Sequence, residues 1–90
     1  MHQHKRAIED YDEAIRLDSK NADAYNNRGA VYKRLGQNKS AIESYTQALE
    51  ADPEYVAALT NRANLYQAMG KTELAKRDFA RLKELKTKPH

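Results

Sequence analysis

A chain of 90 residues forms one domain at most, and the absence of cysteine excludes a disulfide framework, a cysteine-ligated zinc site and a thiol nucleophile. The net charge is +3, but the 16 basic residues are interleaved with 13 acidic ones over most of the length. No apolar run reaches the length of a membrane span, and the N-terminus lacks a signal peptide's hydrophobic stretch. We therefore expect a soluble protein, cytoplasmic rather than secreted.

Apolar residues recur with helical spacing along the whole chain, and no segment shows the strict alternation of a strand. In chain order, this spacing predicts helices over residues 4–17, 22–35, 39–51, 54–69 and 73–86.

Residues at the ends of these segments predict where each helix stops and starts. Gly36 and Gly70 fall where the second and fourth helices should end, because glycine adopts the left-handed C-terminal cap without a steric clash. Asn38 and Thr72 are the expected N-caps of the third and fifth helices. Asp52 is the expected N-cap of the fourth helix, because a proline follows it.

The chain is similar to itself after a shift of 34 residues. The aligned pairs are Tyr25 and Leu59, Asn27 and Asn61, Arg28 and Arg62, Gly29 and Ala63, Tyr32 and Tyr66, Gly36 and Gly70, Ala41 and Ala75, and Tyr45 and Phe79. Residues 7–18 align in the same way with residues 41–52. The chain therefore contains two full pairs of helices, preceded by one helix that matches the second half of a pair.

These positions resemble the tetratricopeptide repeat (TPR), a helix-turn-helix unit of 34 residues. The matching residues of the first full unit are Tyr25, Gly29, Tyr32, Ala41, Tyr45, Ala48 and Pro53. The second unit offers Leu59, Ala63, Tyr66, Ala75 and Phe79. The first unit departs from the pattern at Arg28, where leucine is usual. The second departs at Leu82 and Thr87, which replace a small residue and a proline.

The resemblance implies an all-α fold, an α-solenoid in which five helices form antiparallel hairpins stacked into a right-handed superhelix. Residues 1–21 would be the second-helix half of an incomplete repeat, 22–55 a full repeat, and 56–90 a full repeat with a polar terminal helix. Each hairpin would be narrowest where two small residues meet, at Gly29 with Ala41 and at Ala63 with Ala75.

The resemblance also implies a protein-binding module rather than an enzyme, because the first helices of such repeats line a concave groove. The expected peptide-binding residues are Asn26, Asn27, Ala30, Lys33, Arg34, Thr60, Asn61, Asn64 and Gln67, with Asp23 and Ala57 also lining the groove. An asparagine amide both donates and accepts hydrogen bonds, which suits a peptide backbone. Arg28 and Arg62 have two readings: ligand contact, or packing of the stem with an ion pair to a neighbouring helix.

One subtype of the family holds the C-terminal carboxylates of heat-shock chaperones with Lys, Asn and Arg on three successive first helices. Only two such helices are predicted here, and Ala57 and Asn61 occupy positions where the last of them would need Lys and Arg. We do not expect this chain alone to form that clamp.

The two ends of the predicted array differ. Lys76 and Lys83 replace Ile42 and Leu49 of the preceding unit, which makes the last helix polar. The first helix keeps an apolar face without a preceding partner helix. The expected oligomer-contact residues on that face are Ala7, Ile8, Tyr11 and Ala14. A homo-oligomeric scaffold joined through this helix is thus the second hypothesis.

Other functions find less support in the residues. His2 and His4 have no cysteine or acid beside them, so we expect no metal site, and no phosphate-binding loop or nucleophile pattern indicates a cofactor or catalysis. Basic residues gather near the C-terminus, which makes a nucleic-acid partner the third hypothesis. Acidic residues lie among these basic residues and lower the net positive charge of the cluster. No aromatic residue stands among its exposed basic positions to stack on bases.

Overall fold

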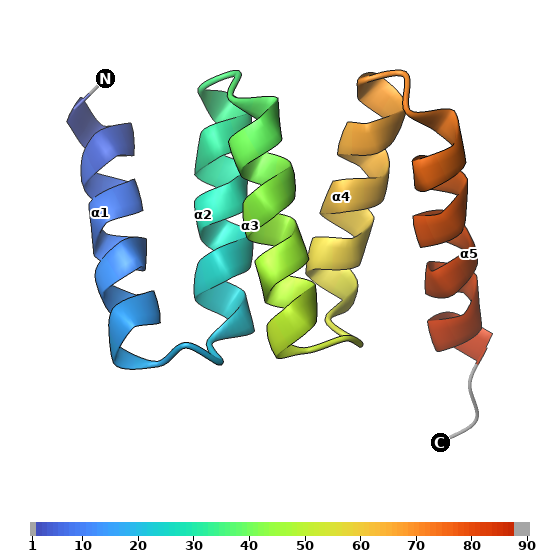
Figure 1. Ribbon diagram of the computed structural model, residues 1–90, viewed down its shortest axis with the longest axis horizontal. Coiled ribbons are helices and arrows are strands. Elements are labelled where there is room, and N and C mark those ends of the chain that lie inside the picture. Colours follow the sequence, from blue (N-terminus) through green and yellow to red (C-terminus); the bar gives the residue numbers. More distant parts are fainter. Residues whose placement is uncertain (1, 88–90) are drawn as a thin grey trace.

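The computed structural model describes residues 2–87. These residues form five helices: α1 (His2–Leu17), α2 (Ala22–Arg34), α3 (Asn38–Ala51), α4 (Val56–Ala68) and α5 (Thr72–Thr87) (Figure 1). None of the residues in this range belongs to a strand. All five helices predicted from the sequence are confirmed, and their ends differ from the predicted ones by at most two residues.

The helices lie side by side in chain order, and each runs antiparallel to the one before it (Figure 1). The closest packing is between α2 and α3 and between α4 and α5, which form the two hairpins. Helices α2 and α4 also approach each other directly, whereas neither α1 and α3 nor α3 and α5 have Cα atoms within 8 Å. Because the first helices of the hairpins lie closer together than the second helices, the surface formed by α2 and α4 is the inner face of the array.

Glycine ends both first helices of the hairpins. Gly36 and Gly70 have φ angles of 76° and 78°, which confirms the predicted left-handed caps. The residue after each glycine closes the cap: the Gln37 N–H donates to the Tyr32 carbonyl at 2.9 Å, and the Lys71 N–H donates to the Tyr66 carbonyl at 2.8 Å. The same turn is thus built twice, one repeat apart.

The predicted N-caps at Asn38 and Thr72 are wrong, because both are already the first residues of their helices. Gln37 occupies the N-cap position of α3 and makes no side-chain capping bond. The prediction for Asp52 is also wrong: α4 begins at Val56, and the Asp52 carboxylate instead accepts from the Glu54 N–H at 3.0 Å. A side-chain cap is found at Asn21, whose oxygen accepts from the Ala24 N–H at 3.0 Å.

The core is most complete in the middle of the array. Ala41, Tyr45 and Ala48 of α3 are at most 1% exposed, because they are covered by the helices on both sides. A Cβ atom at Gly29 would lie 2.6 Å from the Tyr45 ring and 3.2 Å from the Ala41 carbonyl oxygen. The close approach of Gly29 to Ala41 is therefore confirmed, and the Tyr45 ring is an even nearer neighbour.

In the second hairpin, Ala63 and Ala75 are both buried, and their mutual contact stays a prediction. None of the described helices is both long and apolar enough to cross a lipid bilayer.

Candidate functional site

The residues predicted to bind a peptide divide into three groups by exposure. Lys33, Arg34, Asn64 and Gln67 are exposed on α2 and α4, as are Asp23 and Ala57. Asn27, Ala30, Thr60 and Asn61 are half-buried, and Asn26 is only 7% exposed. The structure thus places all of them on the two helices of the inner face, but it leaves little of Asn26 accessible.

Asn26 and Asn61 bind each other across the array. The Asn61 Nδ2 atom donates to the Asn26 Oδ1 atom at 3.0 Å, which joins α2 to α4. This bond satisfies a buried amide oxygen, which would be costly to leave without a partner. The pair forms part of the floor of the inner face. The side-chain amides of Asn27 and Asn64 make no hydrogen bond to other residues within 2–87, so none competes with a ligand there.

A second link crosses the inner face near the N-terminal end of α2. The Tyr55 hydroxyl, in the residue before α4, donates to the Asp23 carboxylate at 2.6 Å. This hydrogen bond, together with burial and the negative charges of Asp23 and Asp52, raises the pKa of Tyr55 to about 12. The sequence analysis missed Tyr55, because it falls in the first turn of the helix predicted over 54–69 and the residue one repeat earlier is Asn21, so no repeated signal marks it.

Charge is distributed unevenly along α2. Asp23 lies in the first turn and is bound to Tyr55, whereas Lys33 and Arg34 lie in the last turn, about 15 Å further along the helix axis. Asn64 and Gln67 are the neighbouring exposed positions near the C-terminal end of α4. The inner face therefore has one basic end with free amide groups beside it.

The Arg28 side chain lies in the contacts between helices, which favours a structural role over ligand binding. Its guanidinium donates to Asp12 of α1 at 2.7 Å, to the Ser44 hydroxyl of α3 at 3.0 Å, and to Gln47 of α3. It also lies 5.5 Å from the centre of the Tyr25 ring, within the range of a cation–π contact.

Arg62 repeats this arrangement one unit later with its carboxylate on the other side. It donates two hydrogen bonds to Asp78 of α5, at 2.7 and 2.8 Å, and one to Thr46 of α3 at 3.2 Å. The bonds to Asp78 raise the pKa of Arg62. Both arginines thus make ion pairs to a neighbouring helix, which is the second of the two roles predicted for them.

The predicted oligomer-contact residues are all half-buried. They are Ala7, Ile8, Tyr11 and Ala14 of α1. Tyr45, which occupies the same repeat position as Tyr11, is 1% exposed, and Phe79 at that position in α5 is 38% exposed. The apolar faces at the two ends of the array are therefore covered less completely than those in the middle. Among residues 2–87 no group of three or more potential metal ligands comes together.

Comparison with protein families gives three overlapping matches. Residues 22–55 and 44–77 match a tetratricopeptide repeat, and residues 3–36 match a TPR repeat. The curated proteins contain no significant match.

Several solved structures are similar over almost the whole chain. MamA is 29% identical, with a TM-score of 0.91 over 96% of this chain, and this chain spans only 50% of the MamA chain. The second TPR of Spaghetti (RPAP3), bound to the HSP90 peptide SRMEEVD, is 33% identical, with a TM-score of 0.83 over 91% of this chain and 76% of its own. The second TPR domain of human RPAP3, in complex with the HSP70 peptide SGPTIEEVD, is 31% identical, with a TM-score of 0.85 over 98% of this chain and 73% of its own.

Proposed function

Because the chain belongs to the tetratricopeptide repeat family, we propose that it is a protein-interaction module that binds an extended peptide along the inner face of α2 and α4. Similar TPR domains bind short peptides of chaperones, which supports a peptide partner here. No feature of the described residues supports a catalytic role in its place.

The observation that carries the proposal is a set of polar side chains on the inner face that make no hydrogen bond or ion pair to other described residues. Asn27 and Asn64 offer amide donors and acceptors for a peptide backbone, and Lys33 and Arg34 add two exposed positive charges at one end. Ala30, Thr60 and Gln67 complete the contact surface. We assign Asn26 and Asn61 a different part in it, since their mutual hydrogen bond shapes the floor.

The basic end favours an acidic peptide segment. Each exposed charge pair contributes only about 0–1 kcal/mol, so binding should be weak to moderate and should weaken as salt is added. The C-terminal carboxylate of the peptide should matter little, because Ala57 and Asn61 stand where a carboxylate clamp would need cationic side chains.

The peptide SRMEEVD and the same peptide with an amidated C-terminus test this proposal by nuclear magnetic resonance titration. We expect both to shift the side-chain amide signals of Asn27, Asn64 and Gln67 to a similar extent. Asn27→Ala combined with Asn64→Ala should weaken binding several-fold with little change in the melting temperature. Asn61→Ala is unsuitable, because it would leave the buried Asn26 oxygen without its partner and so change stability as well.

Lys76→Ala is the matched control, because Lys76 lies on α5, away from the inner face. It should change neither affinity nor stability. Unaltered affinity in the double asparagine variant, or signal changes confined to residues outside α2 and α4, would show that the inner face is not the binding surface.

A second candidate function is self-assembly through α1. The observation that favours it is the incomplete cover of Ala7, Tyr11 and Ala14, whose counterparts Ala41, Tyr45 and Ala48 are completely buried. A second copy packed on this face would remove apolar surface from water. Sedimentation at increasing concentration should then show a rising mass, and Ala14→Glu should abolish the increase. A constant monomer mass would eliminate this candidate.

A further inference from the structure

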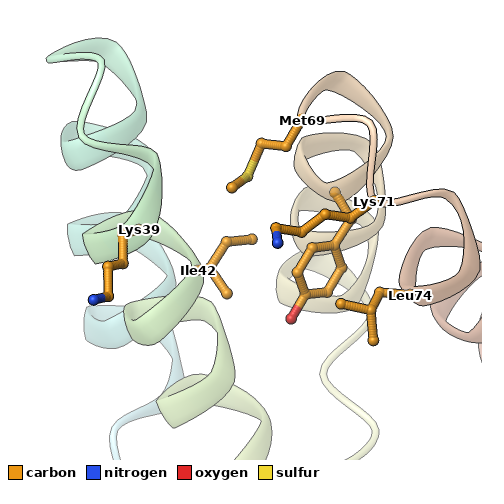
Figure 2. A pocket seen from close by; sticks show the side chains of 6 residues that line it. Lys39, Ile42, Met69, Lys71 and Leu74 are labelled. Atoms are coloured by element: carbon orange, nitrogen blue, oxygen red, sulfur yellow. The ribbon is translucent and has the colours of Figure 1, made fainter.

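A cavity of about 420 Å3 lies between α3, α4 and the start of α5. Figure 2 shows the side chains that line it: Lys39 and Ile42 from α3, Tyr66 from α4, Met69 and Lys71 from the following turn, and Leu74 from α5. The volume lies within the range of about 300–1,000 Å3 that is typical of ligand pockets.

This cavity is separate from the inner face. Tyr66 and Met69 follow Asn64 by two and five residues, so they lie about 200° and 140° around α4 from that exposed asparagine. A ligand bound between Asn27 and Asn64 would therefore not reach the cavity. The two surfaces occupy opposite sides of α4.

The walls of the cavity are apolar and its charged residues are of one sign. Ile42, Met69 and Leu74 present their side chains to the space, and Leu74 is 38% exposed although it is a large apolar residue. Lys71 extends its ammonium group toward Ile42, and Lys39 lies on the other side of Ile42 (Figure 2). Both formally charged residues that line the cavity are lysines, and no acid lines it.

We propose that this cavity is a second docking site, for a partner segment in which a large apolar side chain is flanked by carboxylates. The apolar side chain would enter between Ile42, Met69 and Leu74, where it would cover the exposed part of Leu74. The flanking carboxylates would pair with Lys39 and Lys71 at the rim. Charge complementarity thus favours an acidic partner segment over a basic or neutral one.

The internal repeat supplies a natural comparison. One unit earlier, the equivalent positions are occupied by Lys5, Ile8, Tyr32, Leu35, Gln37 and Ser40. Four of the six keep the same chemistry, but glutamine replaces Lys71 and serine replaces Leu74. The junction between α1 and α2 thus lacks the second cation and the exposed leucine, and we expect it not to bind the same segment.

This comparison gives the test variant: Lys71→Gln with Leu74→Ser puts the residues of the earlier junction into the later one. Both residues are exposed, so the melting temperature should stay nearly unchanged. The probe is an acetylated and amidated peptide of sequence EELFEE, with QQLFQQ and EESSEE as comparison peptides. The readout is the set of methyl signals of Ile42, Met69 and Leu74.

We expect EELFEE to shift the methyl signals of Ile42, Met69 and Leu74 saturably, and the two comparison peptides to bind at least about tenfold more weakly. In the double variant, the shifts of the remaining Ile42 and Met69 signals should require at least about tenfold more peptide. Lys33→Gln with Arg34→Gln, which alters the inner face instead, should leave them unchanged.

Three outcomes would overturn the proposal. Shifts at Asn27 and Asn64 in place of the methyl signals would assign the peptide to the inner face. Equal binding of QQLFQQ would remove the charge argument. Methyl shifts that depend on protein concentration without peptide would identify a second copy as the occupant. If this proposal fails, the proposed peptide site on α2 and α4 still stands, because that site is tested with a different peptide and by the signals of different residues.

Discussion

A methyl group added at Gly29 would lie 2.6 and 2.7 Å from two carbon atoms of the Tyr45 ring. The ring is 1% exposed and is packed between helices, so it cannot move aside without disturbing its neighbours. We expect Gly29→Ala to lower the free energy of unfolding by about 1–3 kcal/mol, although alanine is the better helix former. Chemical denaturation measures the change.

Position 63 provides the control, because Ala63 already occupies the equivalent place in the second hairpin. The aromatic residue equivalent to Tyr45 is Phe79 there, which is 38% exposed and therefore less confined. Ala63→Gly should be destabilising by about 1 kcal/mol, through the higher entropy of glycine in the unfolded chain. A stabilising effect of Gly29→Ala would contradict the overpacking argument.

The hydrogen bond between Tyr55 and Asp23 predicts a specific pH dependence. The pKa of Tyr55 is raised to about 12 in the folded chain, whereas an unfolded tyrosine ionises near pH 10. The folded state therefore keeps the proton longer than the unfolded state. The stabilisation is complete below about pH 10 and is lost as the pH rises from about 10 to about 12.

Urea denaturation across this alkaline range should show a steeper loss of stability in the wild type than in Tyr55→Phe. Asp23→Asn should behave like Tyr55→Phe, because it removes the charge that holds the proton on the hydroxyl. Identical slopes in all three proteins would show that the bond does not persist in solution.

Arg28 and Arg62 show how one repeat position uses its neighbouring helices differently. Arg28 finds its carboxylate on the preceding helix, at Asp12, and a hydroxyl on the following one, at Ser44. Arg62 has these reversed, with Thr46 before it and Asp78 after it. The arginine therefore joins three helices in each unit, and the carboxylate can come from either side.

Because the carboxylate can come from either side, a carboxylate added on α3 should restore stability that is lost when the one on α5 is removed. Asp78 is 8% exposed at its side chain, so Asp78→Ser should lower the free energy of unfolding by about 2–3 kcal/mol by leaving Arg62 without its carboxylate. Adding Thr46→Asp should recover part of that loss, because it puts a carboxylate where Asp12 serves Arg28. Asp12→Thr, at a more exposed pair, should cost only about 0–1 kcal/mol. Equal stability of the single and double variants at positions 46 and 78 would contradict the rescue.

Periodicity predicted the helices, because each apolar stripe is a local property that packing then reinforces. The N-caps at Asn38 and Thr72 were wrong because the turns are so short that Gln37 and Lys71, which close the glycine caps, directly precede the next helix. No separate capping residue fits between them. Turn length depends on how the two helices pack, and that packing cannot be predicted from individual residues.

The predicted surface on α2 and α4 followed from the resemblance to the tetratricopeptide repeat, but that resemblance did not predict the hydrogen bonds within the surface. Asn26 and Asn61 lie on different repeats, and their bond depends on how closely α2 approaches α4. A sequence pattern fixes which face a residue occupies, whereas the distance between two faces is set by packing. Asn61 could therefore be placed on the inner face, while its partner there could not be foreseen.

Burial across the whole array predicts that it is most stable in the middle. Helix α1 has no fully buried residue among those whose side chains are described, whereas α3 has four. In a repeat protein each unit is stabilised mainly by its neighbours, so a helix covered on one side opens more easily. Amide hydrogen exchange should accordingly be fastest in α1 and slowest in α2 and α3.

Repeating the measurement at higher protein concentration separates the two candidate functions. Slower exchange in α1 would mean that a second copy covers it, and unchanged exchange would leave peptide binding as the function. Fast exchange in α3 under either condition would contradict the order of stability inferred from burial.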